Sequence, residues 1–157
     1  MESDQLGIDE KNFIQNLING KAEEVDLKAS LLRLSRYLCK HHRKKVYILL
    51  DEYDTPIQAS FMNGYYDNMK VLMQGLLGAA LKGNLSLNRS VVTGVIRIAK
   101  ESFFSDLNNV KIYSVMQSRY SQYFGFTESE VGGLLQQAGM IDRTAAVKEW
   151  YNGYIFA

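Results

Sequence analysis

The order of apolar and polar positions along the chain predicts helices and strands in turn. A helical period of apolar residues marks three segments, at about residues 9–19, 27–41 and 67–82. Two continuous apolar runs stand between polar segments: Val46–Leu50, and Ser90–Ala99, which we expect to be extended at least as far as Val95. Such runs are typical of strands that are buried on both faces of a parallel sheet. The order strand, helix, strand predicts an α/β fold.

Shorter elements are expected after the second apolar run. Lys111–Val115 is a candidate for a third, short strand. Thr127 and Glu130 have the spacing of a capping box, which predicts the start of a helix. A last helix is predicted for Arg143–Tyr151, before the stop signal Asn152-Gly153. We therefore divide the chain into a helical and linker segment, an α/β core and a small helical extension, at residues 1–26, 27–122 and 123–157.

Composition narrows the classes of protein. The 157 residues are 46% hydrophobic and 22% charged, which is typical of a globular domain. One cysteine excludes an intrachain disulfide and a cysteine-based zinc site, and a net charge of +1 gives no electrostatic reason to expect nucleic-acid binding. No apolar run has the length of a membrane span. The polar, acidic start is unlike a signal peptide, so we expect a cytoplasmic location.

Acidic residues follow the first predicted strand at Asp51, Glu52 and Asp54. Ligands of open α/β sheets bind at the carboxyl ends of strands. An acid at Asp51 could hold Mg²⁺ directly or through water, and Glu52 could polarise a water that attacks a phosphate. The alternative is an ordinary strand followed by a polar loop.

Two polar residues of the second apolar run could take part in the same chemistry. Thr93, just before Gly94, could sense a γ-phosphate or orient the attacking water, and Arg97 could supply positive charge for phosphoryl transfer. Each has a plainer interpretation, since threonine is common in strands and Arg97 could be a surface cation near a sheet edge.

Four stretches together resemble the successive motifs of the bacterial AAA-ATPase-like family. They are YILLDEYDTPI, SVVTGVIRIAKESFFSDLNN, YSQYFGFTESEV and EWYNGY, and the resemblance covers about residues 28–157. Members often carry a PD-(D/E)xK nuclease-like domain further along the chain. The resemblance implies a P-loop fold of three layers that uses ATP and Mg²⁺.

The resemblance also implies roles for particular residues. Asp51 would be the acid on the Mg²⁺ side, Glu52 the base, and Thr93 close to the sensor position, and we assign Asp54 with Asp51 to cofactor binding. Asp106 stands where the family usually has glycine. Further residues match motif positions without an assigned role: Pro56, Phe104, Ser105, Asn108, Asn109, Phe124, Gly125, Phe126, Tyr151, Gly153 and Tyr154.

The phosphate-binding loop of such a fold is missing from the sequence. No G-x-x-x-x-G-K-[ST] occurs, because the nearest match, Gly20-Lys21, has Gln15 and Ala22 at required positions. In the family this loop lies upstream, so we expect the chain to be an internal or truncated piece that does not hydrolyse ATP by itself. The sheet would then be partial, without its P-loop strand.

Two other functions remain open. The chain could be a non-catalytic interaction or oligomerisation module with inherited acids. It could also hydrolyse a substrate with a bare carboxylate site of Asp51, Glu52 and Asp54, although the acid-x-Lys of a PD-(D/E)xK nuclease is absent from Ser90–Ala99.

Loss of the P-loop strand would leave an open edge on the second strand, at Val91–Val95. Unpaired strand edges recruit partners. We therefore expect self-association through this edge, or its repair by the N-terminal segment or the short third strand.

Overall fold

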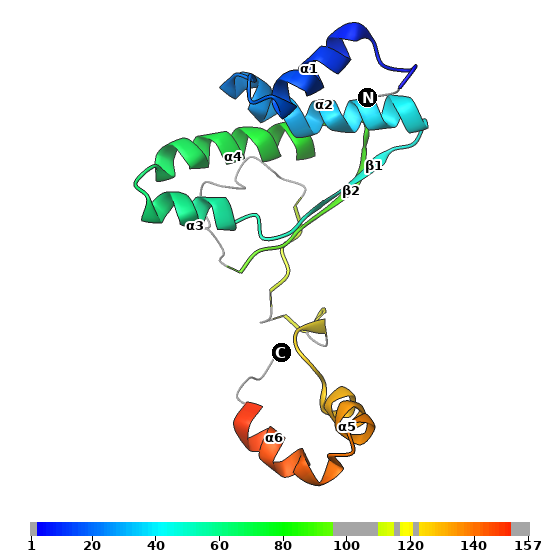
Figure 1. Cartoon of the computed structure of the whole chain (residues 1–157), viewed down its shortest axis with the longest axis vertical. Coiled ribbons are helices and arrows are strands. Elements are labelled where there is room, and N and C mark those ends of the chain that lie inside the picture. Colours follow the sequence, from blue (N-terminus) through cyan, green and yellow to red (C-terminus); the bar gives the residue numbers. More distant parts are fainter. Residues whose placement is uncertain (1–2, 96–109, 115–116, 121–122, 152–157) are drawn as a thin grey trace. The chain divides into compact units, whose positions relative to one another are not determined.

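The computed structural model describes residues 3–95, 110–114, 117–120 and 123–151 (Figure 1). The chain forms two compact units, Met1–Val110 and Lys111–Ala157. The division predicted at residues 26 and 122 stays a prediction.

The first unit is an α/β structure. Its elements are α1 (Ile8–Ile18), α2 (Glu24–His42), β1 (Val46–Leu50), α3 (Thr55–Met62), α4 (Tyr66–Leu81) and β2 (Leu87–Val92). β1 and β2 pair in parallel, with Leu49 opposite Val91 and Leu50 opposite Val92. The predicted α/β class and the parallel pairing are confirmed, while the three-layer arrangement stays a prediction.

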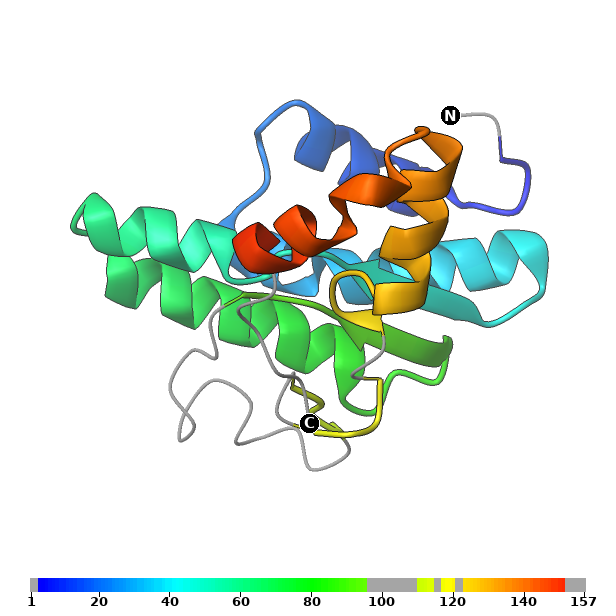
Figure 2. The ribbon, with the colours of Figure 1, turned by 90° about the horizontal axis from the view of Figure 1, so that it is seen from below.

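The core of the first unit is built on the apolar stripe of α4. Leu77, which is 1% exposed, packs in one cluster with Ile48 of β1 and Ile57 of α3. Leu31 of α2 packs against the same cluster, and α3 and α4 lie side by side in both views (Figures 1 and 2). The helix predicted at residues 67–82 is confirmed as α4. Its helical period of 3.6 residues places the apolar side chains of α4 on one face.

α3 was not expected from the hydrophobic pattern. It begins at Thr55-Pro56, with the proline in the first turn. Backbone N–H groups of the first turn have no acceptor within the helix, so the missing N–H of proline costs no hydrogen bond there. Ile57 and Ser60 are buried, and the Ser60 hydroxyl donates to the Ile57 carbonyl at 2.7 Å. The sequence signal for α3 was therefore this proline.

The strands differ from the predictions in burial. β1 alternates, with Ile48 buried but Tyr47 61% and Leu49 76% exposed. The expectation that β1 is buried on both faces is wrong for the described residues, because α2 and α4 contact the sheet through one face.

The strands also differ from the predictions in extent. β2 begins at Leu87 and ends at Val92, so the expected extension through Val95 is wrong. The pairing with β1 runs from Leu87 to Val92. β2 therefore includes the polar residues Asn88 and Arg89, because backbone hydrogen bonds do not depend on side-chain polarity. Residues 96–99 lie outside the described part, and Lys111–Ser114 does not form the expected third strand.

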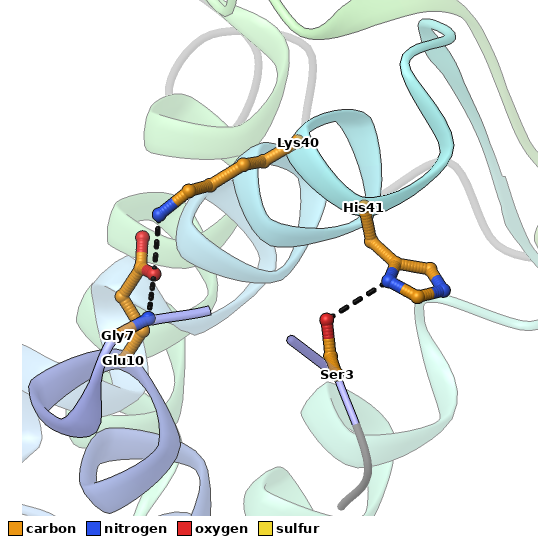
Figure 3. A network of polar contacts seen from close by, with 5 residues as sticks. All are labelled: Ser3, Gly7, Glu10, Lys40 and His41. Atoms are coloured by element: carbon orange, nitrogen blue, oxygen red, sulfur yellow. Dashed lines mark hydrogen bonds and ion pairs between the residues drawn. The ribbon is translucent and has the colours of Figure 1, made fainter. Parts of the chain in front are cut away.

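The N-terminal segment is tied to the C-terminal end of α2 (Figure 3). Glu10 accepts hydrogen bonds from the Lys40 ammonium at 2.7 Å and from the Gly7 amide at 2.8 Å, and Ser3 Oγ lies 2.8 Å from His41 Nδ1. The Lys40 ammonium, followed by the Gly7 amide, lowers the pKa of Glu10 below its ordinary value of 4.5. These contacts hold α1 beside α2.

The second unit is helical where it is described. α5 (Glu128–Gln137) is followed by the 3₁₀ helix η2 (Ile141–Arg143) and by α6 (Thr144–Tyr151). The capping box is present, since the Glu130 amide donates to the Thr127 hydroxyl and the Thr127 amide donates to the Glu130 carboxylate. Both predicted helices are confirmed. Over the described ranges, no helix has the length and apolarity needed to cross a membrane.

Candidate functional site

The carboxyl ends of β1 and β2 lie together, and their backbones stay paired beyond the strands. The Thr93 amide donates to the Leu50 carbonyl at 2.8 Å, and the Tyr53 amide donates to the Thr93 carbonyl at 3.0 Å. Thr93 is therefore held opposite the loop that follows β1, although the two segments are about forty residues apart in the sequence.

Three of the predicted site residues meet at this point. The Thr93 hydroxyl donates to Asp51 Oδ1, and the Glu52 amide donates to Thr93 Oγ1 at 3.4 Å. All three residues are exposed. The Asp51 carboxylate and the Thr93 hydroxyl thus form a pair of oxygen groups that a ligand can reach, and the Glu52 backbone lies beside them.

Glu52 has an unusual backbone. Its φ of 51° lies in the left-handed region, which costs a residue other than glycine about 1–2 kcal/mol. The Thr55 amide donates to the Glu52 carbonyl at 3.0 Å and the Thr55 hydroxyl lies 3.4 Å from Glu52 Oε2. Glu52 therefore lies in a tight turn between β1 and α3. Residues with strained backbone angles are often found at functional sites.

Asp54 differs from the other two acids. It is 1% exposed, and its Oδ2 accepts hydrogen bonds from the Gln58 amide group at 2.9 Å and from the Val95 backbone amide at 3.1 Å. The carboxylate thus joins the first turn of α3 to the segment after β2. Its predicted part in cofactor binding stays a prediction.

Gly94 contacts the buried residues of this loop closely. A Cβ atom at Gly94 would stand 2.7 Å from Asp54 Oδ1 and 2.7 Å from Tyr53 Cε1. A glycine in an apolar run is a sequence signal for such close approach. Sequence reasoning noted this glycine only as the neighbour of Thr93, and did not identify Tyr53 or Gln58.

A metal site made of protein ligands alone is not formed in the described ranges. They contain no group of three or more His, Cys, Asp or Glu side chains that could hold a metal ion. Because Asp54 is buried, the bare site of Asp51, Glu52 and Asp54 is not assembled. One exposed carboxylate still fits Mg²⁺, which proteins commonly hold with one or two carboxylates and the phosphates of a substrate.

Other predicted residues lie outside the described part of the chain. These are Arg97, Phe104, Ser105, Asp106, Asn108, Asn109, Gly153 and Tyr154.

Parallel strands with acids and a hydroxyl at their carboxyl ends define an α/β protein with a candidate ligand site at the usual edge of the sheet. A family described as Predicted AAA-ATPase matches residues 3–104, so the chain belongs to the AAA-ATPase-like family. Nucleotide and Mg²⁺ use is general in such a family.

One curated relative is similar to this chain over most of the chain's length. The chain is 31% identical over 113 residues to an uncharacterized protein in the vnfD 5′ region of Azotobacter chroococcum mcd 1. The match covers 71% of this chain and 22% of that protein. The chain thus spans about a fifth of the relative's length. No solved structure matches the chain.

Proposed function

We propose that the chain supplies the metal-side and water-side residues of an AAA-type ATPase. Asp51 holds the Mg²⁺ of the nucleotide, Glu52 polarises the attacking water, and Thr93 occupies the sensor position. The single observation that supports this proposal is the hydrogen bond from the Thr93 hydroxyl to Asp51, with Glu52 beside both. Family membership makes ATP the nucleotide of choice.

The three residues divide the work by their chemistry. Bound Mg²⁺ and ATP supply the charge compensation and the phosphoryl group. The Asp51 carboxylate offers a hard oxygen ligand, and the Thr93 hydroxyl orients it by donating a hydrogen bond to Oδ1. The Glu52 carboxylate is exposed, with the Thr55 hydroxyl 3.4 Å from Oε2, and would accept a proton from water. Arg97 is proposed, from the sequence, to add positive charge.

Hydrolysis needs a further part. Since the sequence holds no phosphate-binding loop, we propose that this chain alone binds Mg²⁺·ATP weakly and does not turn it over. In this proposal the phosphate-binding loop is supplied by another part of a longer protein or by a second chain. The proposal places the protein in the cytoplasm, which agrees with a single unpaired cysteine.

The test uses Mn²⁺·ATP as a paramagnetic probe of the isotope-labelled chain. We expect selective broadening of the amide signals of Asp51, Glu52 and Thr93, and loss of this effect in Asp51→Ala. Asp67→Ala, which removes an exposed acid from the first turn of α4, is the matched control. Equal broadening in wild type and Asp51→Ala, or none at millimolar probe, would refute the proposal, and the acids would then be inherited features.

A second candidate function is self-association, and the sheet favours it. Within the described residues the sheet has two strands, so each strand has one edge without a strand partner. Tyr47, Leu49 and Val91 are 61%, 76% and 55% exposed. Open edges and apolar sheet faces recruit other chains. We propose a second copy of this chain as the partner.

Light scattering after size exclusion tests this candidate. A mass that rises with concentration in wild type, and returns to that of a monomer in Leu49→Lys, is expected. A strict monomer at every concentration would rule it out.

A further inference from the structure

We propose that Asp54 is a positioning residue, which holds Thr93 opposite Asp51 through the turn at Gly94 and Val95 without touching the ligand itself. The inference rests on the proposed function, because it concerns the same site. It assigns the third acid of the loop a task different from that of its two neighbours.

Burial separates Asp54 from Asp51 and Glu52. At 1% exposure its carboxylate is out of reach of a nucleotide or a metal ion, whereas Asp51 and Glu52 are exposed. A buried carboxylate is costly unless polar partners compensate it. Here the Gln58 side chain and the Val95 backbone amide do so, at 2.9 and 3.1 Å.

The hydrogen bond to Val95 extends the pairing of the two strands. Beyond the end of β2, the Thr93 amide is bonded to the Leu50 carbonyl and the Thr93 carbonyl to the Tyr53 amide. Asp54 then binds the backbone two residues further on. Thr93 is thus held on both sides, and from this backbone position its hydroxyl donates to Asp51.

The close contact at Gly94 makes this arrangement tight. Gly94 has no side chain, so its backbone can lie directly against Asp54. A Cβ atom at Gly94 would stand only 2.7 Å from Asp54 Oδ1. Hydrogen bonds to charged acceptors are about twice as strong as neutral ones. Loss of the charge at Asp54 is therefore expected to loosen Val95 first and Thr93 next.

The experiment compares Asp54→Asn and Asp54→Ala with Asp67→Asn, which removes an exposed acid from the neighbouring helix α4. In the full chain, the Val95 amide proton is followed by chemical shift and by exchange with solvent. We expect it to move upfield in both Asp54 variants and to exchange about tenfold faster or more in Asp54→Ala. The Asn variant keeps an oxygen acceptor, so it remains informative if the Ala variant does not fold.

A readout at Thr93 distinguishes positioning from a general structural role. We expect the Thr93 methyl and amide signals to shift in Asp54→Asn while the methyl signals of the core residue Leu77 stay in place. We also expect the Mn²⁺·ATP broadening at Thr93 to weaken severalfold in Asp54→Asn and to be unchanged in Asp67→Asn.

Three results overturn the inference. An unchanged Val95 amide would show that the contact is not made, and a shifted Val95 with an unmoved Thr93 would show that the contact positions nothing. Shifts of Leu77 as large as those of Thr93 would indicate a general structural role. If wild type shows no Mn²⁺·ATP effect at all, the proposed function fails, but the coupling from Asp54 to Thr93 is still decided by the signals without probe.

Discussion

Substitution of Gly94 by alanine tests the packing at the end of β2. The new methyl group would meet Asp54 Oδ1 at 2.7 Å and the Tyr53 ring at 2.7 and 2.8 Å. Both neighbours are buried, at 1% and 7% exposure, so neither can turn into solvent to make room. Gly94 is not among the residues with positive φ, so the cost comes from the contacts and not from the backbone angle.

The size of the effect follows from these distances. Separations under 3 Å between carbon and its neighbours require the structure to shift, and overpacking of this kind costs about 1–3 kcal/mol. For a chain of this length, each kcal/mol lowers Tm by about 2–4 °C. Gly94→Ala is therefore expected to lower Tm by about 2–12 °C.

Gly78→Ala provides the matched control in the same unit. Gly78 lies inside α4, and a Cβ atom there has nothing within 4 Å. Alanine is the better helix former and limits the unfolded chain, so this change should stabilise by about 0.4–1 kcal/mol. Thermal unfolding followed by circular dichroism measures both variants. Equal or higher stability of Gly94→Ala than of wild type would refute the close approach described here.

Further variants and an NMR titration test other parts of the chain. Leu77→Ala empties the centre of the core and should cost about 2–5 kcal/mol in denaturant unfolding, whereas Leu85→Ala, at 88% exposure, should change stability by less than about 0.5 kcal/mol. Thr127→Ala removes the cap of α5 and should weaken that helix by about 1 kcal/mol, visible as faster amide exchange in its first turn. Glu10 has a lowered pKa, chiefly because of Lys40. Its stabilising contribution is therefore present above pH 4.5 and is lost as the pH falls through the folded pKa. An NMR titration should place the midpoint of Glu10 below 4.5 and show it returning toward that value in Lys40→Met. An unshifted midpoint in wild type would contradict the ion pair.

The sequence determined those features that depend on neighbouring residues. The stripe of α4 and the capping box at Thr127 and Glu130 act within a few residues, so the pattern located both helices closely. The apolar run before Asp51 likewise located β1, because its five residues favour an extended strand, although only one face of that strand proved to be buried. The acids were identified from their position directly after this strand, because ligands of open α/β sheets bind at the carboxyl ends of strands.

Only the tertiary structure decided which of the acids is exposed and which is buried. Asp51 and Asp54 are three residues apart and chemically identical, yet one is exposed and the other is 1% exposed. That difference depends on the turn at Glu52 and on the segment that follows β2. The meeting of Thr93 with Asp51 depends on the register of two strands, which residues about forty positions apart set through backbone hydrogen bonds. A pattern of neighbouring residues does not specify which distant segments pair. The end of β2 at Val92 and the close approach of Gly94 to Asp54 therefore follow only from the folded structure.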